Sequence, residues 1–256
     1  MTAEKDGELK GRVALVTGAG GGACGSAIAR RLAGEGAAII ALDNHERRAR
    51  AVAAAIEADY GVKATACVAD ISDRGALDRA LGEATAAIGP VDILVNNAAI
   101  NIQGSIFDYS PADFDQVLAV DLTACWYLIR QTIGRMRERG WGSIVNISSI
   151  AGYLGGAGRE APYGIAKAGL HDLTRGVALE GGPHNIRCNA IALGLVDSPF
   201  VRRYIDQFKG QIDRLPLRRM ASPQEVAEVV LFLVSDRSSY ITGEIINVSG
   251  GYLLGQ

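Results

Sequence analysis

Residues 12–33 read RVALVTGAGGGACGSAIARRLA, an apolar run followed by a glycine-rich turn and then by helical periodicity. The apolar run before Thr17 predicts a buried strand. Glycines let the backbone turn tightly and approach a ligand, and the helix that follows presents unpaired N–H groups and its positive dipole end. Gly20, Gly22 and Gly25 also spell G-x-G-x-x-G, which is weak as an isolated motif but favours a pyrophosphate site when strand and helix flank it.

Six more apolar runs follow, and stretches of helical periodicity separate them. They occupy residues 37–42, 62–68, 91–97, 142–148, 186–193 and 243–249. Strands that are apolar throughout are typical of a parallel sheet that helices cover on both faces. The 256 residues are enough for one full core. The sequence therefore predicts a single domain over residues 1–256, an α/β, Rossmann-like, doubly wound parallel sheet with right-handed crossovers.

Composition excludes several classes of function. The 26 Lys and Arg residues against 28 Asp and Glu residues give a net charge of −2, which argues against binding to nucleic acid or to an anionic membrane. The N-terminus is polar, and no apolar run approaches the ~18 residues of a membrane span, so we expect a cytoplasmic protein. Neither the three His residues nor the four Cys residues have metal-ligand spacing, so we expect no metal and buried reduced thiols.

Local signals mark several helix starts and one irregular segment. Ser72, Ser110-Pro111 and Ser222-Pro223 each have the composition of a helix N-terminus. Residues 196–220 form the only long irregular stretch late in the chain, and we predict that they form a lid over the substrate.

An acidic residue ends the second predicted strand. Asp43 lies 18 residues after Gly25. A carboxylate at that place accepts hydrogen bonds from the adenosine ribose and repels a 2′-phosphate, so the expected cofactor is NAD. An ordinary strand-end turn residue is the alternative interpretation of Asp43. Arg47 and Arg48 are near enough to keep binding of NADP open.

A second cluster of polar residues follows the fifth predicted strand. The strand ends in Ser149, and Tyr163 and Lys167 come later with an i to i+4 spacing. On a helix this spacing puts both side chains on one face, where the ammonium group stabilises a tyrosinate and makes the phenol a usable acid or base. Ser148 has no His or acid partner at the spacing of a hydrolase, which disfavours acyl transfer.

With these motifs the chain resembles the short-chain dehydrogenase/reductase family over nearly its whole length. The resemblance implies a seven-stranded parallel sheet, a nicotinamide cofactor, a homotetramer and the reversible oxidation of secondary alcohols to ketones. It implies that Tyr163 is the acid/base, that Lys167 lowers the pKa of that tyrosine and binds the nicotinamide ribose, and that Ser149 polarises the carbonyl. It also implies these residues at the cofactor: Gly18, Gly22, Gly25, Asp70, Ile71, Asn97, Val196 and Ser198.

The sequence departs from the family pattern at four places. The phosphate loop looks one residue longer because its last glycine is Gly25, and two later turns contain Ala99 and Leu193 in place of the usual Gly and Pro. The fourth catalytic residue of the family, an Asn, is here Asp121. Its backbone carbonyl can still serve a water-mediated proton relay. We therefore expect Asp121→Asn to change kcat less than about tenfold and to leave the pH profile almost unchanged. The alternative is a carboxylate close enough to Lys167 to favour its ammonium form, and its removal would then shift the pH profile.

These observations favour an NAD(H)-dependent oxidoreductase that acts on a small-molecule alcohol/ketone pair. Two alternatives remain open. One is an NADP-linked 3-oxoacyl-thioester reductase that acts on acyl carrier protein or coenzyme A derivatives. The other is a non-catalytic, cofactor-binding protein of the same fold. The set of Ser149, Tyr163 and Lys167 argues against the second alternative.

Overall fold

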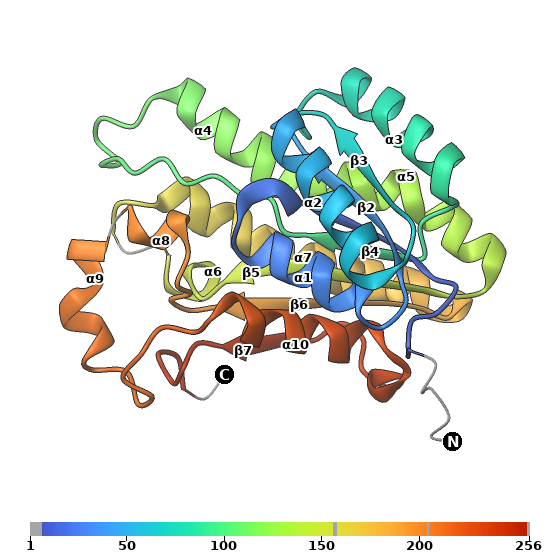
Figure 1. The fold of residues 1–256 in the computed structure, drawn as a ribbon. Helices are drawn as coiled ribbons and strands as arrows, with labels where there is room; N and C mark the ends of the chain where they lie inside the picture. Colours follow the sequence, from blue (N-terminus) through green and yellow to red (C-terminus); the bar gives the residue numbers. More distant parts are fainter. Residues whose placement is uncertain (1–6, 156–157, 204, 255–256) are drawn as a thin grey trace.

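A computed structural model describes residues 7–155, 158–203 and 205–254, apart from the side chains of Phe200, Gln207 and Lys209. Its centre is one parallel sheet in which the strands lie in the order β3-β2-β1-β4-β5-β6-β7 (Figure 1). The seven predicted apolar runs all form strands, and the predicted fold class is confirmed. The strands are β1 (Val13–Thr17), β2 (Ala38–Asp43), β3 (Ala64–Val68), β4 (Ile93–Asn96), β5 (Gly142–Ser149), β6 (Ile186–Leu193) and β7 (Ile245–Val248).

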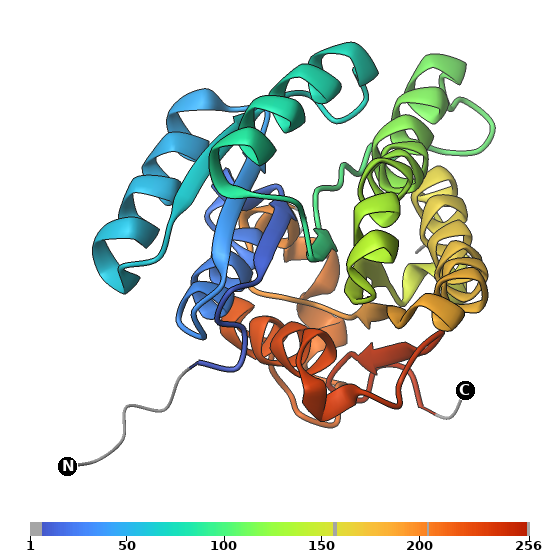
Figure 2. The same ribbon diagram turned by 90° about the vertical axis from the view of Figure 1, so that its right-hand side faces the viewer.

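Both faces of the sheet are buried, which explains why its strands are apolar without alternation. In β1, Val13 and Leu15 belong to one apolar cluster, whereas Ala14 and Val16 belong to the cluster on the opposite face. Helices from different parts of the chain cover each face (Figure 2). One face packs against α1 (Cys24–Ala33), α2 (Glu46–Tyr60) and α10 (Pro223–Val234), and the other against α3 (Arg74–Ile88), α5 (Ala124–Arg139) and α7 (Ala161–Gly181).

Two of the three predicted helix starts are confirmed. Ser110 accepts a hydrogen bond from the N–H of Asp113 at the start of α4 (Pro111–Leu118), and Ser222 forms a capping box with Glu225 at the start of α10. The expectation for Ser72 was wrong. Its hydroxyl donates to the Asp70 carboxylate at 2.7 Å, and the side chain of the next residue, Asp73, caps α3 instead.

One helical turn between α4 and α5 is wider than an α-helix. It is the π-helical segment η2 (Ala119–Thr123), after which the N–H of Ala124 donates to the carbonyl of Ala119. Such π turns are rare in proteins, but those that occur often lie at functional sites. This one contains Asp121. The remaining short helices are η1 (Ala19–Gly21), α6 (Ala151–Leu154), η3 (Gly182–His184), α8 (Pro199–Arg202), α9 (Ile205–Ile212) and η4 (Asp236–Ser238).

The strand order places a ligand crevice beside β1. The chain leaves β1 toward β2 on one side and leaves the neighbouring strand β4 toward β5 on the other side, so these two connections run in opposite directions. In open α/β sheets ligands bind at the carboxyl ends of the strands at this switch point. Across residues 7–155, 158–203 and 205–254, no helix has the length and apolarity to cross a membrane, and no three His, Cys, Asp or Glu residues are grouped as metal ligands.

Candidate active site

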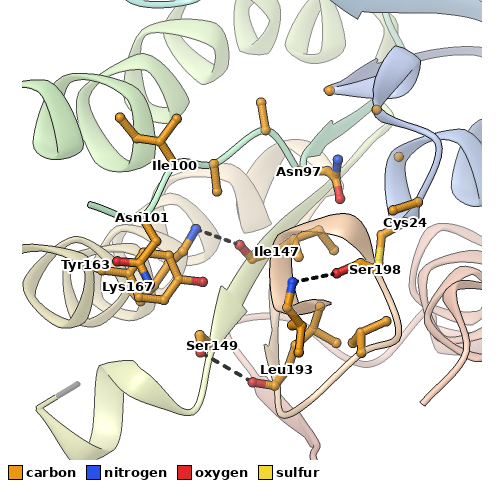
Figure 3. A pocket seen from close by; sticks show the side chains of 18 of the residues that line it. Cys24, Asn97, Ile100, Asn101, Ile147, Ser149, Tyr163, Lys167, Leu193 and Ser198 are labelled. Atoms are coloured by element: carbon orange, nitrogen blue, oxygen red, sulfur yellow. Dashed lines mark hydrogen bonds between the residues drawn. The ribbon is translucent and has the colours of Figure 1, made fainter. Parts of the chain in front are cut away.

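A single cavity of about 570 Å³ brings most of the predicted site residues together at the carboxyl ends of the strands. Ser149, Tyr163 and Lys167 lie on one side of it, with Asn97 and Cys24 across from them (Figure 3). Gly22 and Asp121 are not among the lining residues, and Asp121 is fully buried. The other predicted residues that line the cavity are Gly18, Gly25, Asp43, Asp70, Ile71, Val196 and Ser198.

The glycine-rich loop has the shape of a cradle that side chains would fill. Gly18 and Gly22 both have a φ of 67°, in the left-handed region that favours glycine. A Cβ atom on Gly25 would overlap the carbonyl oxygen of Gly18, and it would lie 2.7 Å from the amide nitrogen of Asn97. The N-cap residue of α1, Ala23, provides no side-chain hydrogen bond to the first N–H groups of that helix. These features fit the pyrophosphate of a dinucleotide.

Asp43 lines the cavity and also accepts a hydrogen bond from this loop. Its Oδ2 accepts a hydrogen bond from the N–H of Gly20 at 3.0 Å, and its Oδ1 accepts one from the backbone N–H of His45 at 2.9 Å. A carboxylate has about four acceptor sites, so both oxygens can still accept from ribose hydroxyl groups. Arg48 also lines the cavity, and its Cβ would lie 2.8 Å from a Cβ on Gly20. The end of β2 and the first turn of α2 therefore present one carboxylate and one guanidinium group to the same part of the cavity.

Asn97 connects the two strands at the switch point. Its side-chain amide donates to the carbonyl of Thr17 at 2.8 Å, and its backbone N–H donates to the Thr17 hydroxyl at 2.8 Å. The ends of β1 and β4 are thus held together directly beneath the glycine loop. This gives Asn97 a positioning role in the cavity wall.

The three predicted catalytic side chains lie together, and Tyr163 and Lys167 share one side of α7 as their spacing predicts. Ser149 is the last residue of β5, and its hydroxyl hydrogen-bonds Tyr163. Lys167 Nζ lies 5.2 Å from the centroid of the Tyr163 ring and donates to the Ile147 carbonyl at 3.2 Å. Lys167 is 2% exposed, so its charge acts on the tyrosine with little screening by water.

Opposing influences act on the pKa of Tyr163. Burial raises it most strongly, the Lys167 charge and the Ser149 hydrogen bond lower it, and the Asp121 charge raises it again. The contribution of Lys167 has the expected sign. The overall result is nevertheless a raised pKa, so the phenol of Tyr163 holds its proton at neutral pH in the free protein.

The side chain of Asp121 is part of this cluster, which is the alternative to the backbone role that we expected from the sequence. Its Oδ2 lies 3.2 Å from Lys167 Nζ in a fully buried ion pair, and its Oδ1 accepts the N–H of Ile100 at 2.8 Å. Burial opposes the charged form of Lys167, but the charge of Asp121 helps to raise the pKa of that lysine overall. Asp121 therefore offsets part of the effect that Lys167 has on Tyr163.

This contact replaces our expectation that only the backbone of Asp121 matters. Asp121→Asn removes a charge that raises the pKa of Tyr163. Oxidation of an alcohol needs the tyrosinate, so the pH-dependent rise of kcat/KM for oxidation should move to lower pH. The measurement is kcat/KM against pH for both proteins in the oxidation direction. Superimposable profiles would contradict the electrostatic role of the carboxylate.

Ser148 has a histidine partner that lies far from it in the sequence. The Ser148 hydroxyl lies 2.8 Å from Nε2 of His171, a residue 23 positions later, and donates to the Lys167 carbonyl at 3.1 Å. The tautomer of His171 sets which of the two groups donates in this contact: when the hydroxyl donates to the Lys167 carbonyl, Nε2 of His171 is the donor to Ser148. Burial lowers the pKa of His171 to about 4, which keeps it neutral. This pair holds α7 against β5 behind the catalytic side chains.

Glu160 is a further cavity residue that the sequence did not single out. Its only sequence signal is a spacing of three residues before Tyr163.

Comparison with known proteins places this geometry among oxidoreductases. Residues 19–253 match the family described as Enoyl-(Acyl carrier protein) reductase. The chain is 39% identical over 245 residues to the 3-oxoacyl-[acyl-carrier-protein] reductase of Aquifex aeolicus, covering 95% of this chain and 98% of that one.

Two solved structures share the fold closely. A gluconate 5-dehydrogenase from Burkholderia cenocepacia, in complex with NADP and tartrate, superposes with a TM-score of 0.90 at 31% identity, covering 96% of this chain and 97% of that one. A protein described as a short chain dehydrogenase/reductase family protein superposes with a TM-score of 0.83 at 37% identity, covering 95% and 98%.

Proposed function

The chain belongs to the short-chain dehydrogenase/reductase family of oxidoreductases, and we propose that it interconverts a secondary alcohol and a ketone with NAD(H). One observation carries this proposal. Ser149, Tyr163 and Lys167 line the same cavity as the glycine loop and Asp43. One part of the cavity fits a dinucleotide, and the other part holds an acid/base group beside it.

The residues of the chain divide the work of proton transfer and positioning. When bound, the nicotinamide ring accepts or returns the hydride at C4. Tyr163 takes the hydroxyl proton of the alcohol during oxidation and returns it to the carbonyl oxygen during reduction. Ser149 donates a hydrogen bond to that same oxygen, and Lys167 stabilises the tyrosinate electrostatically. The burial of Lys167 against Asp121 keeps its ammonium group in one place.

The remaining predicted residues would hold the cofactor. The loop from Gly18 to Gly25 would receive the pyrophosphate, and Asp43 the adenosine ribose. Asp70 and Ile71 would flank the adenine, and Val196 and Ser198 would meet the carboxamide. Residues 196–220, which carry α8 and α9 beside the cavity, are the proposed lid over the substrate.

A panel assay tests the proposal. Cyclic and acyclic secondary alcohols are offered with NAD or with NADP, and the absorbance of the reduced cofactor is followed. We expect turnover of at least one alcohol with NAD. The absence of turnover in both directions, with ketones and NADH included, would favour a non-catalytic protein of this fold.

The choice of NAD rests on Asp43, and a substitution tests it. We expect kcat/KM with NAD to exceed that with NADP by at least about tenfold, or ~1.4 kcal/mol. Asp43→Ala should narrow this preference, chiefly by raising KM for NAD, because it removes both the ribose acceptor and the repulsion of a 2′-phosphate. Because Asp43 also holds Gly20, some loss with both cofactors is expected.

Arg48→Ala is the matched variant on the same side of the cavity. It should leave the use of NAD unchanged and should weaken the use of NADP, since Arg48 is the base that lines this end of the cavity. Equal efficiencies of the wild-type enzyme with the two cofactors would refute selection by Asp43.

An NADP-linked 3-oxoacyl-thioester reductase is the second candidate. It is favoured by the name of the Aquifex aeolicus relative and by the position of Arg48 at the cavity. Activity on an acyl-carrier-protein or coenzyme A thioester with NADPH, well above that on simple ketones with NADH, would decide for it.

A further inference from the structure

We propose that Glu160 selects substrates that carry a second hydrogen-bond donor, a hydroxyl or an ammonium group, on the carbon next to the reacting carbinol. The same carboxylate would disfavour substrates with a carboxylate at that place. The inference rests on the proposed function, because it concerns the alcohol that the same site oxidises.

The position of Glu160 places its side chain beside the acid/base residue. It borders the cavity and immediately precedes α7, and its carbonyl accepts the N–H of Gly164 at 2.9 Å within the first helical turn. Glu160 is the N-cap residue of α7, Tyr163 lies in the first turn of that helix, and both line the same cavity. The Glu160 charge also raises the pKa of Tyr163, which agrees with this closeness. A group next to the reacting carbon is therefore within its reach.

Glu160 is largely buried as a residue, and few described groups hydrogen-bond its carboxylate. The residue is 7% exposed. Among the described residues its side chain has one hydrogen-bond partner, the amide of Gln103 at 2.7 Å, and no cation lies within ion-pair distance. A buried carboxylate needs paired charges or several donors to recover its lost hydration. A donor group of the substrate would supply what the described side chains do not.

The wall that carries Glu160 is fixed by backbone contacts. The N–H of Gly104 donates to the Arg159 carbonyl at 2.9 Å, next to the contact between Gln103 and Glu160. On the same loop, the N–H of Ile100 is bonded to Asp121. The Glu160 carboxylate is thus held against a loop that is tied to the catalytic cluster, which is the arrangement that a specificity residue requires.

The other charges of the cavity argue against an anionic substrate. Of the lining residues that the structure describes, Arg48 and Lys167 are the basic ones. Arg48 lies beside Asp43 and Gly20, at the end proposed for the adenosine, and the charge of Lys167 is offset by Asp121. The polar lining residues near the substrate end are uncharged apart from Glu160: Asn101, Gln116, Gln211 and Tyr252.

Four matched substrates on one ring test the inference: cyclohexanol, its vicinal diol, its vicinal amino alcohol and its vicinal hydroxy acid. The kcat and KM values are measured for the wild type, for Glu160→Gln, and for Glu180→Gln as a control. Glu180 is an exposed acid near the far end of the same helix. Calorimetric binding of the diol to the protein with NADH bound gives a readout that is independent of turnover.

In the wild type, kcat/KM for the diol or the amino alcohol should exceed that for cyclohexanol by at least about tenfold, mainly through KM. The hydroxy acid should be the poorest substrate. Glu160→Gln should remove most of the preference for the amino alcohol and part of the preference for the diol. It should raise kcat/KM for the hydroxy acid. Glu180→Gln should change none of these ratios. A larger preference for the amino alcohol than for the diol identifies the donor as ammonium, and the reverse order identifies it as hydroxyl.

A uniform effect of Glu160→Gln on all four substrates, or a wild-type preference for the hydroxy acid, would overturn the inference while leaving the proposed function intact. If the wild type oxidises none of the alcohols, the result would instead contradict the proposed function. If Glu160→Gln does not fold, Glu160→Asp serves in its place. Aspartate keeps the charge, but its side chain is one methylene shorter and reaches less far into the cavity. This variant should therefore lose the preference for the diol and still disfavour the hydroxy acid.

Discussion

Tyr163→Phe should lower kcat by about 100- to 10,000-fold while NADH binds almost as well as to the wild type, because only the proton-carrying hydroxyl is lost. The ring itself keeps its place on α7, with Lys167 Nζ 5.2 Å from its centroid. The measurements are the steady-state rate in both directions and the titration of cofactor fluorescence. A variant that retains more than about a tenth of the wild-type rate would refute the assignment of the acid/base.

No pH should restore the rate of Tyr163→Phe. Ser149 and Lys167 hold no proton that can replace the phenol hydrogen, because the serine hydroxyl is a very weak acid and the lysine ammonium is paired with Asp121. Recovery of the Tyr163→Phe rate at high pH would point to hydroxide or to a second group as the base.

Lys167→Ala is expected to damage the rate, the binding of the cofactor and the stability together. We expect kcat/KM to fall by more than about 100-fold, because the tyrosinate loses its stabilising charge and the ribose loses a ligand. The variant also leaves Asp121 buried and 0% exposed without its cation. Breaking a buried ion pair in this way typically costs about 3–5 kcal/mol of folding free energy.

A double variant separates the two causes. Lys167→Ala combined with Asp121→Asn removes both charges, so much of the thermal stability should return while the rate stays low. The measurements are the unfolding midpoint and the kcat/KM of each single variant and of the double variant. Recovery of the rate together with the stability would show that Lys167 acts only through folding.

The fold was predictable because its signals are local and redundant. The seven strands are apolar without alternation because both faces of the sheet are buried, as the opposite clusters of Ala14 and Leu15 show. Glycine positions such as Gly18 follow directly from the backbone, which has positive φ there. The N-cap of α3 was the exception. Ser72 and Asp73 are adjacent and chemically similar, and the choice between them was made by the contact of Ser72 with Asp70.

The contacts within the site were less accessible, because they depend on tertiary distances. The spacing of Tyr163 and Lys167 lies on one helix and was therefore visible in the sequence. Asp121 meets Lys167 across 46 positions through the π-helical turn η2, and periodicity does not indicate such a contact. The pairing of Ser148 with His171 crosses from a strand to a helix. Each of these contacts brings together elements whose relative placement appears only in the folded protein.

Transfer of deuterium tests the central claim most directly. The protein is incubated with NAD and with a secondary alcohol that carries deuterium on the carbinol carbon, chosen from the panel that it oxidises. The reduced cofactor is then analysed by mass spectrometry and by the proton spectrum of the nicotinamide. We predict that one deuterium appears at C4 of the nicotinamide and that none appears with Tyr163→Phe over the same period. Oxidation of the alcohol without deuterium in the cofactor would contradict direct hydride transfer at this site.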